Sequence, residues 1–109
     1  MKIAKVEKIN GLHTQMLAYF LEKLRSTKDG DGTLLDHSMI VYGSCISDGN
    51  THENSDLPIL LLGGGTKAKM GRHIAYPKDT PMCNLYLTML DTLGIHMDSF
   101  GDSTGKLEL

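Results

Sequence analysis

The sequence predicts a truncated three-layer α/β arrangement with an N-terminal helix, two or three buried strands and a C-terminal helix. Apolar residues recur at steps of three and four in two separate segments, as they do along one face of a helix. Two short runs between these segments are almost entirely apolar, which is typical of strands covered on both faces. Two such strands do not form a stable sheet alone. We therefore expect residues 1–109 to be a single fragment of a larger α/β domain.

The first helix is predicted from a stripe of apolar residues in the first quarter of the chain. The stripe consists of Ile3, Val6, Ile9, Leu12, Met16, Phe20 and Leu24. The Asn10–Gly11 pair is a place where this helix can kink or split, since Gly costs about 1 kcal/mol in a helix interior. The pattern ends in residues 26–32, which are dense in turn formers.

Two buried strands are predicted at residues 38–43 and 57–62, with Pro58 tolerable at the start of the second. A polar loop at 47–56 joins them, and three glycines at 63–65 end the second strand sharply. A third, short strand is expected at 73–76.

A second helix is predicted to begin with Thr80 as N-cap and Pro81 at the first helical position. Its apolar stripe is Leu85, Met89 and Leu93, with Met82, Tyr86 and Leu90 nearby. Gly94 supplies a C-terminal stop. Residues 98–109 form a polar tail, which is either ordered by contacts or frayed.

The bulk composition disfavours several classes of partner. The net charge is −2 and there is no block of consecutive basic residues, so nucleic acid is not an expected partner. No apolar run is long enough for a membrane span, and this chain carries no signal-peptide core. Cys45 and Cys83 could pair, but cysteines in such surroundings are more often buried and inert.

Two Gly-rich segments resemble ligand-binding loops but lack the residues or the spacing that such loops require. Residues 29–32 resemble the start of an EF-hand, but the following positions hold Thr33 and Leu34 and no glutamate closes the loop. Residues 63–67 lack the spacing of a phosphate-binding loop. Both segments are better explained as turns.

The loop after the first strand is the best candidate site. Asp48 and His52 could ligate a divalent metal such as zinc or calcium, with Asn50 as a further oxygen ligand or a contact to substrate. The alternative is a turn in which Asp48 and Asn50 bond nearby backbone while His52 is solvated. Arg72 and His73 could hold an anionic group, although a lone His is more often structural.

Many of these segments together resemble the C-terminal part of the HXXSHH family, exported bacterial proteins of unknown function. The matching stretches are residues 19–24, 29–36, 41–44, 47–52, 57–61, 71–73, 77, 84–87 and 99–105. The motif that names the family is absent and would precede this chain. Family members often carry a His two places after the position of His52, where this chain has Asn54.

The family is similar, more remotely, to the alkaline phosphatases and sulfatases. That resemblance implies an alkaline-phosphatase-like fold and a metal-dependent ester hydrolase, exported as a whole and inactive as this fragment alone. It implies a missing N-terminal part as the main partner, while the strand edges allow self-association. The alternative is a non-catalytic exported domain with a structural or binding role.

Overall fold

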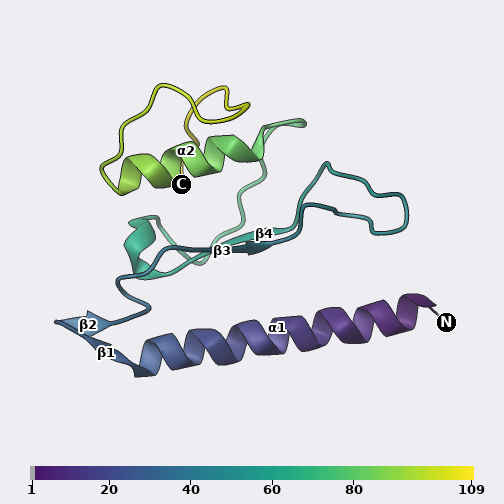
Figure 1. Cartoon of the computed structure of the whole chain (residues 1–109), viewed down its shortest axis with the longest axis horizontal. Helices are drawn as coiled ribbons and strands as arrows, with labels where there is room; N and C mark the ends of the chain where they lie inside the picture. Colours follow the sequence, from purple (N-terminus) through teal and green to yellow (C-terminus); the bar gives the residue numbers. More distant parts are fainter. Residues whose placement is uncertain (1) are drawn as a thin grey trace.

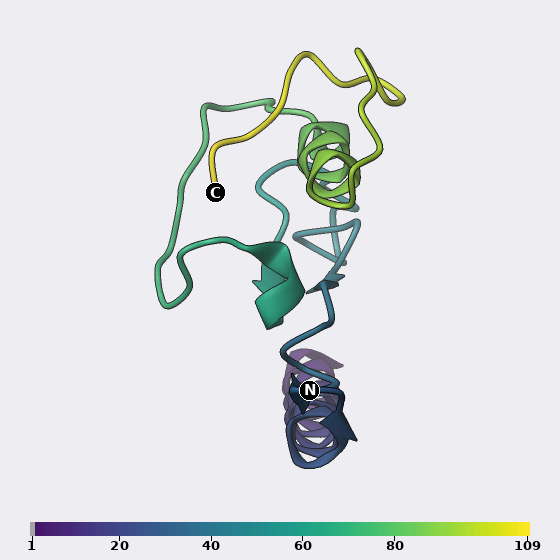
Figure 2. The same cartoon turned by 90° about the vertical axis from the view of Figure 1, so that its left-hand side faces the viewer.

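The protein, described here from a computed structural model, is a mixed α/β chain in which residues 2–109 are placed. Its elements are two α-helices, two small antiparallel sheets and one short 3-10 helix. Figures 1 and 2 show α1 (Lys2–Ser26) and α2 (Met82–Thr92) on opposite sides of the larger of the two sheets, which lies in the centre of the molecule. The mixed α/β character predicted from the sequence is therefore confirmed.

α1 is continuous through the Asn10–Gly11 pair, so the expected kink or split is absent from Lys2–Ser26. A side chain added at Gly11 would meet nothing within 4 Å, so this position faces open space. Gly11 therefore lowers the intrinsic helix propensity, but no neighbouring group forces the helix to break there.

A tight hairpin follows α1, where the sequence is dense in turn formers. β1 (Lys28–Asp29) pairs antiparallel with β2 (Gly32–Thr33), and Gly30 takes a positive φ of 57° in the connection. The carboxylate of Asp36 accepts hydrogen bonds from the backbone N–H and the hydroxyl of Thr33, at 2.9 and 2.8 Å. These local bonds stabilise the turn after β2.

The central sheet consists of β3 (Ile40–Gly43) and β4 (Ile59–Leu62), paired antiparallel with Val41 opposite Leu61. The strands were expected to be buried on both faces, but they are only half-buried, and Leu60 remains 50% exposed. Within the described residues each strand has a neighbour on one side alone. The expected strand at 73–76 is wrong, since that segment pairs with no other strand.

The glycines at 63–65 are required by a close approach of two backbones. Gly63 has a φ of 97°, and a Cβ there would lie 2.2 Å from the Ser38 carbonyl oxygen. The N–H groups of Gly64 and Gly65 donate to the carbonyls of Leu35 and Ser38, at 2.9 and 3.0 Å. The short helix η1 (Gly64–Thr66) completes this turn.

α2 starts one residue later than predicted, with Pro81 as the N-cap. The Thr80 hydroxyl donates to the Pro77 carbonyl at 2.6 Å and so caps the preceding turn instead of the helix. Gly94 ends the helix with a φ of 82°, as its position predicted. The Ile95 N–H then reaches back to the Leu90 carbonyl at 2.9 Å, a common helix-ending pattern.

The buried face of α2 agrees with the predicted stripe at Leu85 but not at Leu93. Leu85 and Leu87 are the fully buried apolar side chains of the described residues, Leu87 at 2% exposure, while Leu93 is exposed. Asn84, 5% exposed, exchanges two hydrogen bonds with Thr104, and the Thr88 hydroxyl bonds both backbone groups of Leu107. The C-terminal tail is therefore ordered by contacts along α2.

None of the helices in the described part of the chain is both long and apolar enough to cross a membrane.

Candidate functional site

The loop between β3 and β4 is itself a small hairpin. The Ser47 N–H donates to the Glu53 carbonyl at 2.8 Å, and the Glu53 N–H donates to the Asp48 carbonyl at 3.2 Å. This pairing places Asp48 opposite Glu53 and leaves residues 49–52 as the exposed tip. In Figure 1 the loop extends well beyond the central strands.

Asp48 is held by the turn that it starts. One of its carboxylate oxygens accepts the backbone N–H groups of Asn50 and Thr51, at 2.8 and 3.4 Å. The Asn50 bond is the stronger cause, and together they hold the pKa of Asp48 below its usual value of 3.8. The carboxylate is therefore ionised at neutral pH, and the arrangement is the Asx-type turn that the sequence left open as an alternative.

His52 closes the tip in the left-handed region, with a φ of 56°. This conformation is uncommon for a residue other than glycine. Asn50 contributes to the turn through its backbone N–H. The expected pair of Asp48 and His52 thus belongs to one short, exposed loop.

Sequence reasoning missed Glu53, which faces Asp48 across this hairpin. Its carboxylate accepts bonds from the hydroxyl and backbone N–H of Ser55, at 2.7 and 3.1 Å, and these bonds lower the pKa of Glu53. The sequence feature that could have identified Glu53 is its position directly after His52. Among residues 2–109, however, no group of three or more His, Cys, Asp or Glu side chains is arranged to hold a metal ion.

Arg72 and His73 lie in a different region from this loop. Arg72 lines a small cavity beside Leu61, in the second half of β4, and His73 does not line it. At about 3.3 Å per residue, the stretch from Leu61 back to Leu57 alone spans about 13 Å. Arg72 and His73 therefore lie outside the hairpin of residues 47–53 that carries Asp48 and His52.

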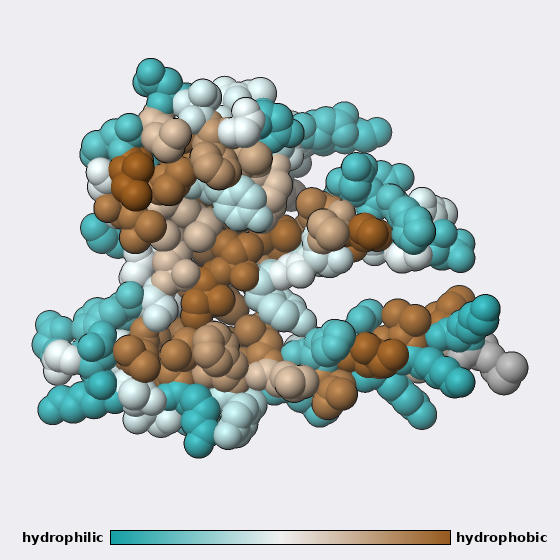
Figure 3. Space-filling view, viewed as in Figure 1, coloured by the Kyte–Doolittle hydropathy of each residue, from teal (hydrophilic) through white to brown (hydrophobic). Residues whose placement is uncertain are grey.

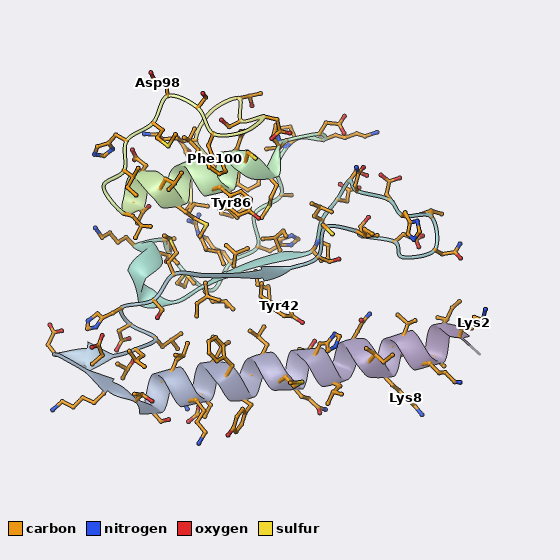
Figure 4. The ribbon with its side chains drawn as sticks, viewed as in Figure 1. Lys2, Lys8, Tyr42, Tyr86, Asp98 and Phe100 are labelled. Carbon is orange, nitrogen blue, oxygen red and sulfur yellow. The ribbon has the colours of Figure 1, made fainter. Side chains whose placement is uncertain are left out.

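A second feature missed from the sequence is an apolar groove between α2 and the chain before β3. It has a volume of about 380 Å³ and is lined by Met39, Tyr86, Met89, Leu90, Leu93 and Phe100. Tyr86 and Phe100 meet edge to face, with ring centroids 6.3 Å apart, and Figure 4 shows them side by side. Met89 and Leu93, predicted in the buried stripe of α2, therefore line an open groove, whereas Leu85 of the same stripe is buried elsewhere.

The cysteines also differ from expectation. Cys45 is exposed and Cys83 is half-buried, and both are free thiols. A hydrogen bond with the Asp102 carboxylate raises the pKa of Cys83, which disfavours a reactive thiolate.

With this geometry established, we compared the chain with protein-family models, with curated proteins and with solved structures, and none of the three comparisons finds a match.

Proposed function

We propose that this chain is one structural part of a larger α/β protein, similar to the metal-dependent phosphatases and sulfatases, and that it is inactive alone. The observation that supports this proposal is the amount of surface that the fold leaves open. The chain exposes 8354 Å², whereas a compact protein of 12.0 kDa exposes about 6,000 Å². The excess of about 2,300 Å² is the amount that one side of a large permanent interface buries.

The excess surface is apolar along α1. The exposed apolar residues of this helix include Ile3, Val6, Ile9, Leu12, Met16 and Phe20, with Ile3 at 84% exposure. Figure 3 shows apolar side chains along this helix and an open space between its N-terminal part and the loop above it. Exposed apolar patches of this extent are typical of interfaces. Another polypeptide segment, or a second copy of the chain packing against α1, would cover such surface.

The loop from Asp48 to His52 is the chain's proposed contribution to a metal site. The described residues fit such a site only in part, because Asp48 and His52 supply two ligands and a catalytic zinc site commonly uses three from the protein. One Asp48 oxygen is already engaged by the turn. The remaining ligands would have to come from the polypeptide that covers this chain.

A second candidate function, a non-catalytic structural or binding domain, is favoured by the Asx-type turn at Asp48. The turn gives this carboxylate a structural role that needs no metal. Zinc titration by calorimetry separates the two candidates. If the hydrolase proposal is correct, the chain binds zinc weakly. Asp48→Asn and His52→Gln should each abolish this binding, whereas Asn54→Gln should retain it. Binding that survives both substitutions, or no binding at all, favours the non-catalytic domain.

The larger-protein proposal is tested by the association state of the chain. We expect light scattering to show association that increases over about a hundredfold range of concentration, as mass action requires. Replacing Ile9 and Met16 by Ser should abolish it, whereas Gln15→Ser, on the same helix, should not. A monodisperse monomer at every concentration would contradict the proposal.

A further inference from the structure

The segment after β4 is strongly basic although the whole chain is slightly acidic. Residues 57–78 contain Lys67, Lys69, Arg72 and Lys78 and no Asp or Glu, which gives this stretch a formal charge of +4. These cations are not consecutive, so they escape a search for basic runs. None of Lys67, Lys69 or Arg72 takes part in an ion pair within residues 2–109.

Two of these cations line the same small cavity. Lys69 and Arg72 face it together with apolar walls from Leu61 and Ile74 and with Leu109, the last residue of the sequence, and its volume is about 100 Å³. This is well below the roughly 300 Å³ at which pockets for drug-sized ligands begin. The space therefore suits a small group rather than a large molecule.

The local backbone holds the two cations at the cavity. Gly71, with a φ of 76°, turns the chain between them. The Nε of Arg72 donates to the Lys69 carbonyl at 2.8 Å, which folds the arginine back over the loop. Within the described residues, the other guanidinium nitrogens have no protein hydrogen-bond acceptor and are available to a ligand.

We infer that this cavity binds a tetrahedral oxyanion, such as a phosphate group, with Arg72 as the main contact and Lys69 as a second charge. A guanidinium presents a planar set of donors that matches phosphate oxygens. Two positive charges beside apolar walls also concentrate the electrostatic field on a small ligand. The site is separate from the Asp48–His52 loop and does not depend on the metal proposal.

The test is a titration of the full chain with inorganic phosphate, followed by backbone amide shifts at constant ionic strength set by chloride. We expect saturable shifts confined to the residues around the cavity, namely 61, 68–74 and 109. Arg72→Gln and Lys69→Gln should each weaken binding at least tenfold. Lys78→Gln removes the same charge from the same segment without lining the cavity, so binding should change less than twofold.

A parallel titration with glycerol 3-phosphate distinguishes a free ion from a phosphate ester. Binding of both probes supports a site for the phosphate group itself, and binding of inorganic phosphate alone restricts the site to the free ion. Equal shifts with chloride, or equal weakening in Lys78→Gln, would overturn the inference. Should the Gln variants unfold, Arg72→Lys keeps the charge without the planar donors, and unchanged affinity there would also overturn it.

Discussion

At the scale of single residues, His37 links strand β1 and the turn of the first hairpin to the segment that follows. Its Nδ1 lies 2.8 Å from the Asp29 carboxylate and its Nε2 lies 3.3 Å from that of Asp31. Asp36, beside it in sequence, is a third acid and is itself engaged by Thr33. The hydrogen bond to Asp29 is the main reason why the pKa of His37 is raised above 6.5.

A raised folded pKa fixes the sign of the pH dependence. His37 contributes stability that is fully present below about pH 6.5, its unfolded pKa, and is lost as pH rises through the folded value. We expect His37→Gln to remove this component, so that variant and wild type converge in stability at high pH. Urea unfolding between about pH 5.5 and pH 8.5 measures the difference in unfolding free energy between the variant and wild type, with His13→Gln on α1 as the control. A constant difference across that range would contradict the ion pair.

At the scale of elements, two glycines have opposite roles. Gly63→Ala should destabilise the chain by about 2 kcal/mol or more, because the turn needs a positive φ and the new Cβ would meet the Ser38 carbonyl. Gly11→Ala should instead stabilise α1 by about 1 kcal/mol, since nothing lies near that position. Urea midpoints compare the two variants. A neutral Gly63→Ala would show that the backbone of η1 does not approach Ser38 so closely.

Local patterns predicted the helices and the two central strands because each depends mainly on its own periodicity and on nearby turn residues. The third strand at 73–76 failed because a strand also needs a partner, which periodicity does not supply. The predicted buried face of α2 was right at Leu85 but placed exposed Leu93 in it and omitted Asn84, for a similar reason. Asn84 and Thr88 are covered by the tail about twenty residues further along, and hydrogen bonds across that separation leave no local signal.

The candidate sites show the same division between local and non-local information. The turn at Asp48 is made by neighbours two and three residues away, and the sequence offered it as one of two alternatives. The cavity at Arg72 also needs Leu61 and Leu109, which are distant along the chain. Sequence reasoning could therefore name Arg72 but could not find the cavity or its second cation, Lys69.

At the scale of the whole molecule, the chain is more open than a domain of its length. Its radius of gyration is 15.9 Å, whereas a compact domain of 109 residues has about 13 Å. The helices lie on opposite sides of a sheet with only two strands, so much of α1 has nothing to pack against (Figure 2). The open shape and the exposed apolar side chains therefore have a common cause.

This openness predicts an unusual heat capacity of unfolding. An ordinary domain of 109 residues has a ΔCp of about 1.3–1.6 kcal/mol/K, because that quantity follows the apolar surface exposed on unfolding. The isolated monomer buries less apolar surface, so calorimetry on dilute samples should give a ΔCp below this range. Raising the concentration should increase both ΔCp and Tm if association covers α1. A ΔCp within the ordinary range at every concentration would mean that the monomer is as compact in solution as a complete domain.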